Sequence, residues 1–234
     1  MTQLEEIKKE LKKASNPETA EGLRKYFKTG KGQYGEGDIF IGIKMPVIRS
    51  IAKKYDLSQS DIEKLLQSPI HEERMTALMI LVRRARKASE EELAAMSRFY
   101  LKNKKYINNW DLIDLSAEHI VGEHLYRNDR KILDRLASSS SVWDRRIAML
   151  CCFAFIKKGE YDFAIHIANT LIKDKHDLIH KASGWMLREI GNRDQKTLEK
   201  YLAGSYKKMP RTMLRYSIEK FPEKKRQAYL KGRI

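Results

Sequence analysis

The segment DRRIAMLCCFAF, residues 144–155, decides the fold because similar helical segments recur along the chain. These segments begin near Arg74, Asp111, Arg146, Lys181 and Arg211, at intervals of 37, 35, 35 and 30 residues. Helix pairs of about this length bury their apolar faces against neighbouring pairs and stack into a curved solenoid. The spacing therefore predicts a helical repeat with a concave groove. The alternative is an irregular helical bundle with accidental spacing.

Second helices are predicted between these segments, at residues 90–106, 130–136, 161–172 and 195–206. The one strand candidate, residues 38–43, is short and lies in a Gly-rich stretch that we interpret as a loop between helices. Breaks in the helical pattern are brief, and no stretch is long enough to be a linker. We therefore expect a single all-α domain over residues 1–234.

Composition excludes several classes of protein. The chain has 234 residues, of which 42% are hydrophobic, with only 12 Gly and 5 Pro, so it is neither disordered nor collagen-like. No apolar run approaches the length of a membrane span, and the charged amphipathic start is unlike a signal peptide. The neighbouring Cys151 and Cys152 suggest buried thiols in a reducing cytosol. We expect a cytoplasmic protein without a membrane partner.

The charge of the chain points to its partner. The formal net charge is +16, with a pI near 9.7, and basic clusters recur within the predicted helices. Such a charge fits a polyanion, most simply nucleic acid, and a basic groove suits a rod-shaped one. The alternative is that the lysines only keep the protein soluble. A groove within one chain requires no dimer or other protein partner, so we expect a monomer.

Familiar catalytic motifs are absent. The sequence has no phosphate-binding glycine loop, no dinucleotide fingerprint, no serine nucleophile elbow, no HExxH and no CxxC pair. The six histidines form no recognisable ligand pattern, and each is interpreted as a surface or packing residue. We therefore predict no metal and no cofactor.

The segment around Trp110 and Asp114 carries the chemistry. The two residues are four apart, so they share one face of a helix. An indole attracts a cation, and a neighbouring carboxylate can stabilise developing positive charge or orient a water. Asp111 competes for this role, although it could simply favour the helix N-terminus. Trp110 could equally be a packing residue, and Asp114 the partner of a neighbouring Arg.

Two later repeats offer residues at comparable positions. If the inner helices are in register, an arginine of the third repeat and Trp185 of the fourth converge with Trp110 and Asp114 on the concave surface. Arg145 and Arg146 are adjacent, so only one of them points into the groove, and periodicity does not choose between them.

These residues match a known family. The chain resembles the AlkD family of alkylpurine DNA glycosylases, built of HEAT-like repeats, over roughly residues 2–222. The resemblance implies a right-handed HEAT-like solenoid with a concave basic groove. The matching strings are Phe40-Ile41-Gly42-Ile43 with Pro46 and Arg49, Trp110-Asp111-Leu112-Ile113-Asp114, Trp143-Asp144-Arg145-Arg146-Ile147-Ala148, and the segment from Lys181 to Glu189.

The resemblance implies an activity and roles for particular residues. Such enzymes excise cationic N3- and N7-alkylated purines from double-stranded DNA and leave an abasic site, without a metal or cofactor and without enclosing the base in a pocket. The family's catalytic Asp falls on Asp114, its flanking aromatics on Trp110 and Trp185, and its phosphate-binding Arg on Arg146. No lyase step is implied, because no catalytic Lys is.

Further DNA contacts are expected from Tyr26 and Lys181. The pair Asn108-Asn109, which departs from the family pattern, is interpreted as a helix cap, and the loop Gly30–Gly37 looks longer than the family's. Association with the nucleoid is expected when the protein is bound to DNA. The alternative functions are a catalytically silent repeat protein that binds damaged or bent DNA, and a scaffold whose groove holds an acidic partner helix.

Overall fold

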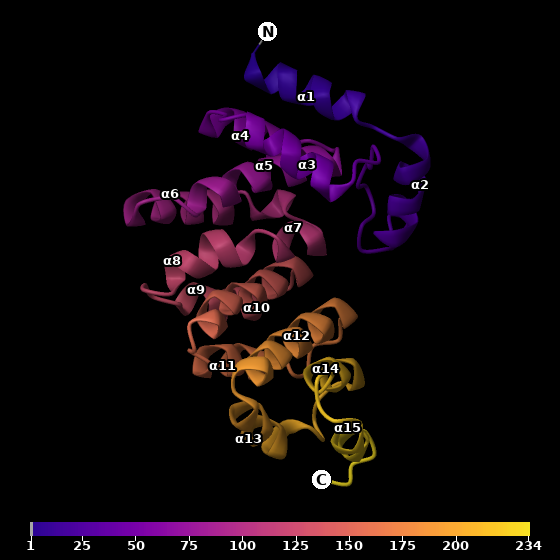
Figure 1. Ribbon diagram of the computed structural model, residues 1–234, viewed down its shortest axis with the longest axis vertical. Helices are drawn as coiled ribbons and strands as arrows, with labels where there is room; N and C mark the ends of the chain where they lie inside the picture. The colour runs from indigo at the N-terminus through magenta and orange to yellow at the C-terminus, as the bar shows by residue number, and fades with distance from the viewer. Residues whose placement is uncertain (1) are drawn as a thin grey trace. The chain divides into compact units, whose positions relative to one another are not determined.

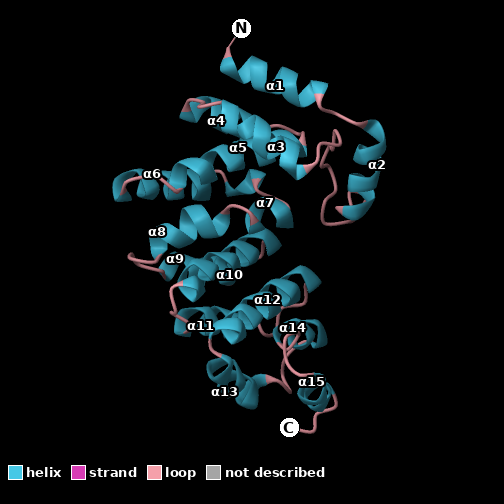
Figure 2. Cartoon of the chain, in the orientation of Figure 1, coloured by secondary structure: helices cyan, strands magenta, loops and turns pink. Residues whose placement is uncertain are grey.

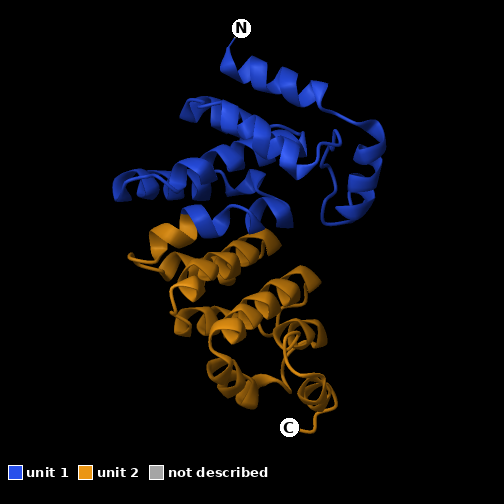
Figure 3. Cartoon of the chain, viewed as in Figure 1, with its two compact units in different colours: residues 1–120 blue, residues 121–234 orange. Residues whose placement is uncertain are grey.

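The computed structural model describes residues 2–234, and within that range the regular structure is helical, with no strand (Figures 1 and 2). Residues 38–43 form a loop, as predicted, whose single β-bridge pairs Ile39 with Ile70 in parallel. The chain divides into two compact units, residues 1–120 and 121–234 (Figure 3).

The helices of unit 1 match the predicted segments in position but not at every boundary, since the helix predicted over residues 90–106 ends at Lys102 and a 3-10 turn follows. The predicted repeat starts near Arg74 and Asp111 fall in α5 and α7, and the predicted second helix falls in α6. The helices of this unit are α1 (Gln3–Lys13), α2 (Pro17–Tyr26), α3 (Met45–Lys54), α4 (Gln59–Leu66), α5 (His71–Ala85), α6 (Glu90–Lys102), the 3-10 turn Lys104–Tyr106 and α7 (Trp110–Asp114).

Local sequence explains where several of these helices begin. Thr2 and Glu5 form a capping box at α1, and Ser89 and Glu92 form one at α6, so backbone N–H groups that have no partner inside the helix are satisfied. Helix α5 is buried along most of its length, and α1, α3, α4, α6 and α7 all contact it. The core of unit 1 therefore surrounds α5.

A buried carboxylate of α5 fixes the loop that precedes α3. The Glu72 carboxylate accepts hydrogen bonds from the backbone N–H groups of Ile41 (3.1 Å), Gly42 (2.8 Å) and Ile43 (3.3 Å). Gly42 has a φ of +87°, and a Cβ there would lie 2.0 Å from the carbonyl oxygen of Asn16, at the start of α2. Only glycine therefore allows α2 to pack against this loop.

The helical segment predicted to begin near Asp111 is short and interrupted. Helix α7 ends after five residues at Asp114, and a π-helical turn follows at Glu118–Gly122. The hydroxyl of Ser116 donates to the carbonyl of Leu112 and pairs at 3.0 Å with the Tyr100 hydroxyl. Side-chain bonds of this kind compete with helical backbone bonding and bend helices, which accounts for the break. Interruptions of this type recur at functional sites.

The helices of unit 2 follow the predicted order. The repeat starts near Arg146, Lys181 and Arg211 fall in α10, α12 and α14. The predicted second helices fall in α9, which precedes α10, and in α11 and α13, which lie between the later starts. This unit comprises α8 (Glu123–Leu125), α9 (Lys131–Ala137), α10 (Val142–Lys157), α11 (Asp162–Thr170), α12 (Asp177–Arg193), α13 (Gln195–Ser205), α14 (Arg211–Ser217) and α15 (Glu223–Leu230).

Packing in unit 2 centres on α10 and α12, which contact each other and the helices adjacent to them in the chain. Cys151 and Cys152 on α10 are free and buried, as predicted, and burial raises the pKa of the Cys152 thiol above its usual range. A Cβ at Gly184 would lie 2.5 Å from the Tyr216 Cβ, so this glycine permits the close approach of α12 and α14.

Candidate functional site

Helix α7 carries Trp110 in its first turn and Asp114 at its end, and both side chains are partly exposed. The ring of Tyr26, at the end of α2, meets the Trp110 indole edge-on with 5.8 Å between ring centroids. Tyr26 is 65% exposed, which is unusual for so large a side chain. The structure therefore brings together three of the predicted site residues, all in unit 1.

Trp110 lies at one end of a column of aromatic rings. The indole stacks on Phe27 at 5.0 Å, Phe27 stacks on Phe40 at 4.8 Å, and Phe40 stacks on the imidazole of His71 at 4.4 Å. Because Phe27, Phe40 and His71 are buried, the column fixes one face of the indole and leaves part of the ring accessible.

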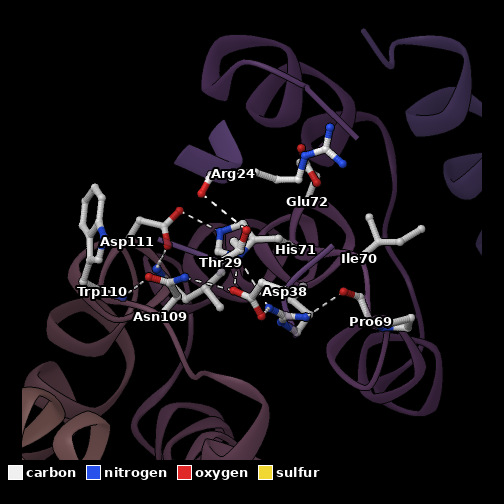
Figure 4. Close-up of polar contacts among 12 residues, drawn as sticks. Arg24, Thr29, Asp38, Pro69, Ile70, His71, Glu72, Asn109, Trp110 and Asp111 are labelled. Carbon is white, nitrogen blue, oxygen red and sulfur yellow. Dashed lines mark hydrogen bonds and ion pairs between the residues drawn. The ribbon is translucent and has the colours of Figure 1, made fainter. Parts of the chain in front are cut away.

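His71 is the centre of a buried charged cluster, the His71 cluster, formed by Asp38, His71, Arg74, Asn109 and Asp111 (Figure 4). The imidazole Nδ1 lies 3.2 Å from Asp38 Oδ2, and Nε2 lies 2.8 Å from Asp111 Oδ2. Arg74 donates to the second oxygen of Asp38 at 2.6 Å. Two carboxylates facing the ring favour the imidazolium form, in which both ring nitrogens donate and the two anions of the cluster are balanced by two cations.

Asn109 connects this cluster to the backbone of α7. Its Nδ2 donates to Asp38 Oδ2 at 2.9 Å, and its Oδ1 accepts from the backbone N–H of Trp110 at 2.8 Å. Asp111 acts similarly, because its Oδ1 accepts from the N–H of Leu112 at 2.8 Å. The interpretation of Asn109 as a helix cap is therefore confirmed, and Asp111 both stabilises the helix N-terminus and binds His71.

The electrostatics of the cluster favour its charged state. Burial alone would lower the pKa of His71, but hydrogen bonds to Asp111 and Asp38 outweigh it and raise that pKa above the usual value. Burial alone would raise the pKa of Asp38, but the hydrogen bond from His71, the charge of Arg74 and the hydrogen bond from Asn109 lower it. Both shifts stabilise the ionised pair.

The remaining site residues lie in unit 2. The Trp185 indole N–H donates to Glu189 Oε1 at 3.3 Å, one turn further along α12, and the ring is tilted against Phe153 of α10 at 5.8 Å. The ammonium group of Lys181 pairs with Asp177 at 2.7 Å on the same helix. Trp185 therefore contacts a residue of its own helix and one of α10, and Lys181 forms an ion pair within α12.

The structure distinguishes the two adjacent arginines. Arg145 donates to Asp174 at 2.5 Å and to the backbone carbonyls of Ser139 (2.9 Å) and Ser140 (2.8 Å), so its guanidinium is occupied. Arg146 is 5% exposed, and its Nη1 donates at 2.5 Å to the carbonyl of Leu178, in the first turn of α12. Neither guanidinium is a freely exposed anion-binding group.

Sequence reasoning missed the role of His71 and of its partner Asp38. These residues lie 40 and 73 positions before Asp111, and no motif joins the three, so nothing in the sequence pattern marks them as partners. Within residues 2–234, no group of His, Cys, Asp or Glu has an arrangement that would hold a metal ion. Over the same residues, no helix has the length and apolar character to cross a membrane.

Comparison with known proteins supplies the wider context. No curated protein sequence matches the chain. A solved structure described as a predicted DNA alkylation repair enzyme from Enterococcus faecalis superimposes with a TM-score of 0.70 at 18% identity, covering 89% of this chain and 97% of that one, and this likeness shows the fold. The family model described as DNA alkylation repair enzyme matches residues 7–221. The chain therefore belongs to the DNA alkylation repair enzyme family.

Proposed function

We propose that this protein is a monofunctional DNA glycosylase that hydrolyses the N-glycosidic bond of cationic N3- and N7-alkylated purines in double-stranded DNA. Family membership gives it a role in DNA alkylation repair. The observation that carries the finer proposal is the pairing of a partly exposed indole and carboxylate, Trp110 and Asp114, on a short helix anchored to a buried charged cluster.

The reaction needs stabilisation of positive charge more than it needs a strong base. Alkylation at N3 or N7 makes the purine cationic, so the base departs as a neutral molecule when the C1′–N bond breaks and its electron pair goes to the base. Positive charge then develops on the deoxyribose. We assign its stabilisation to the Asp114 carboxylate, which also orients the water whose oxygen bonds to C1′ and whose proton is lost to the carboxylate or to solvent.

The aromatic residues have a complementary role in this proposal. The faces of Trp110 and Trp185 contact the deoxyribose and attract its developing charge. Tyr26, which is exposed beside Trp110, extends the same surface toward the DNA. The lesion stays outside any enclosed pocket, so the proposal requires only that the sugar reach these side chains.

Arg146 and Lys181 are proposed to contact the DNA backbone. We assign Arg146 a phosphate contact from the family resemblance; because the side chain is 5% exposed and its Nη1 donates to the carbonyl of Leu178, that contact is confined to one edge of the guanidinium. Replacing it with Lys keeps the charge but loses the planar group, which is not a conservative change at such a contact. Lys181, paired with Asp177 on the surface of α12, contributes a weaker, salt-sensitive contact.

We further propose that residues 1–234 act as one monomeric HEAT-like repeat with a basic groove and no obligate protein partner, in the cytoplasm where it meets nucleoid DNA. The net charge of +16 supports this proposal. A single cooperative transition in calorimetry supports one domain, and two separate transitions contradict it.

The decisive experiment measures release of free 7-methylguanine from methylated duplex DNA by the wild type and by Asp114→Asn. We expect the variant to lose about 100-fold to 1,000-fold in single-turnover rate while binding duplex DNA as the wild type does. The amide keeps the size of the carboxylate, so the comparison isolates its charge.

Two other outcomes would redirect the assignment. If the purified wild type binds duplex DNA and releases no base, the protein is a catalytically silent binder of damaged or bent DNA. If binding does not weaken log-linearly with salt, with a slope of about −0.9 per phosphate contacted, the groove holds a protein partner instead.

A further inference from the structure

The His71 cluster and the aromatic column share His71, and both lead from it to Trp110 at the start of α7. From His71, one route runs through Asp111 and, by way of Asp38, through Asn109 to the backbone at the start of α7. The other runs through stacked Phe40 and Phe27 to the face of the Trp110 indole. Both the main chain and the side chain of Trp110 are thus tied to one imidazole.

Helix α7 requires such support. It has five residues, and isolated helices this short are unstable because the cost of nucleation exceeds the gain from a single turn. The break after Asp114 removes the support that a continuing helix would supply. The position of Asp114 therefore depends on how the first turn is held.

We propose that His71 is a positioning residue for the glycosylase reaction, which fixes the first turn of α7 so that Trp110 and Asp114 keep the geometry that the reaction requires. His71 is 2% exposed, so its buried ring is not a surface for direct contact with a nucleotide. It acts through Asp111, Asn109 and the aromatic column. The inference rests on the proposed function. It concerns a residue other than those already assigned to the reaction, which are Asp114, Trp110, Trp185 and Arg146.

The charged groups that face His71 determine which hydrogen bonds and charges are lost when this residue is replaced. They are Asp38 from the loop before α3, Arg74 from α5 and Asp111 from α7. Replacement by Gln places an amide nitrogen near the position of Nε2 and keeps a donor to Asp111. It removes the cation and the stacked ring, whereas Asp38 retains its donors Arg74 and Asn109.

The first experiment measures chemistry and binding separately. We expect His71→Gln to lower the single-turnover rate of 7-methylguanine release by about 10-fold to 100-fold, the range expected from a small misplacement of catalytic groups. The dissociation constant for the methylated duplex should change by less than about twofold, because the proposed phosphate contacts are untouched. His166→Gln is the matched control, since His166 is exposed and pairs with Asp134 at 2.6 Å on the surface.

A double substitution guards against a variant that merely misfolds. His71→Gln with Asp111→Asn removes one cation and one anion together, so the cluster stays neutral and the amides can still form a hydrogen bond. We expect the double variant to recover at least about threefold in rate over His71→Gln. A folded His71→Gln with the rate of the wild type, or a loss explained entirely by weaker DNA binding, would overturn the proposal.

The second experiment does not depend on activity. The chain has three tryptophans, so Trp143→Phe with Trp185→Phe leaves Trp110 as the sole indole, and its fluorescence anisotropy decay reports how rigidly it is held. We expect His71→Gln in this background to lower the residual anisotropy, while His166→Gln leaves it unchanged. If the wild type releases no base, the glycosylase proposal fails while this measurement still decides whether His71 fixes Trp110. Unchanged anisotropy in folded His71→Gln contradicts the positioning role.

Discussion

The two tryptophans proposed for the site are held in opposite ways. Trp110 lies on a five-residue helix and is fixed by Phe27, which follows α2, and by the His71 cluster, which includes its neighbour Asn109. Trp185 lies in the middle of the 17-residue helix α12, where it donates to Glu189, one turn away, and packs against Phe153 of α10. The first position depends on tertiary contacts among charged groups, and the second on regular helix geometry and close packing.

This difference predicts where each unit is vulnerable. Unit 1 should be sensitive to the loss of a single charge from a buried network, because the remaining charges are left without compensation. Unit 2 should tolerate changes of charge around Trp185 and should be sensitive to added volume between its helices.

The largest effect on stability is expected from Asp38→Ala. This change leaves the buried cations of Arg74 and His71 without a partner that bonds both, and breaking such a group costs about 3–5 kcal/mol. Unfolding in urea measures the loss. The control is Asp134→Ala in unit 2, which removes the surface partner of His166 and should change stability little. Equal losses in the two variants would contradict the contrast between the units.

A smaller loss is expected from Gly184→Ala in unit 2. The new methyl group would lie 2.6 Å from the carbonyl oxygen of Met213 and closer still to Tyr216, so α12 and α14 must separate, at a cost of about 1–3 kcal/mol. Gly204→Ala in α13 is the matched control, because a Cβ there meets no atom within 4 Å. This control should gain about 0.5 kcal/mol from helix propensity. A neutral Gly184→Ala would show that the helix contact is looser than described.

The pH dependence of stability should differ in sign between two histidines. The raised pKa of His71 means that its contribution is full below about pH 6.5 and is lost as pH rises through its folded value. Burial lowers the pKa of His176; the charge of Arg145 adds to this effect and Asp174 opposes it. The unfolded chain therefore binds a proton here more readily than the folded protein, and His176 lowers stability as pH falls below about 6.5.

Two variants separate these contributions in urea unfolding curves across this pH range. The stability lost in His71→Gln should shrink as pH rises, because the wild type loses the advantage of the imidazolium. His176→Asn keeps a side-chain acceptor at the start of α12, where His176 Nδ1 accepts from the N–H of Leu178. This variant should therefore lose less stability than the wild type as pH falls, and the two should differ only at low pH. Parallel curves for wild type and His71→Gln would show that His71 does not carry charge in the fold.

The smallest effect is expected from Glu189→Gln. The amide oxygen can still accept from the Trp185 indole N–H, while the ion pair with Arg193 at 2.8 Å is lost. Because that pair lies within one helix near the surface, its loss should change the rate of base release by less than about threefold. A loss as large as that of His71→Gln would mean that Trp185, too, is positioned by charge.

The sequence predicts the features that depend on local spacing. The positions of α5, α10, α12 and α14 follow from helical periodicity, although the first three begin three or four residues before the predicted starts. The burial of the two cysteines follows from their place in an apolar segment. The capping role of Asn109 is equally local. Periodicity could not predict the end of α7 at Asp114, because the break involves the Ser116 hydroxyl, which bonds both the carbonyl of Leu112 and the hydroxyl of Tyr100, a residue from another helix.

The features of the site that escaped prediction depend on distant partners. His71 resembles any histidine at a helix start until Asp38 and Asp111 are placed on either side of it. The burial of Arg146 likewise depends on the tertiary environment of α10, and the contact with Leu178 links it to the next helix of the repeat. The family resemblance identifies residues of the site by alignment, whereas the groups that hold them emerge only from the structure.

The carboxylate of Glu72 has one more consequence. Three consecutive amide groups converge on it, as backbone amides converge on phosphate in anion-binding nests. Here the anion is a side chain of the protein itself, so it is always present. The loop that carries Phe40 is therefore ordered without a bound ligand. In the proposed complex with DNA, this loop therefore needs no further ordering when the protein binds.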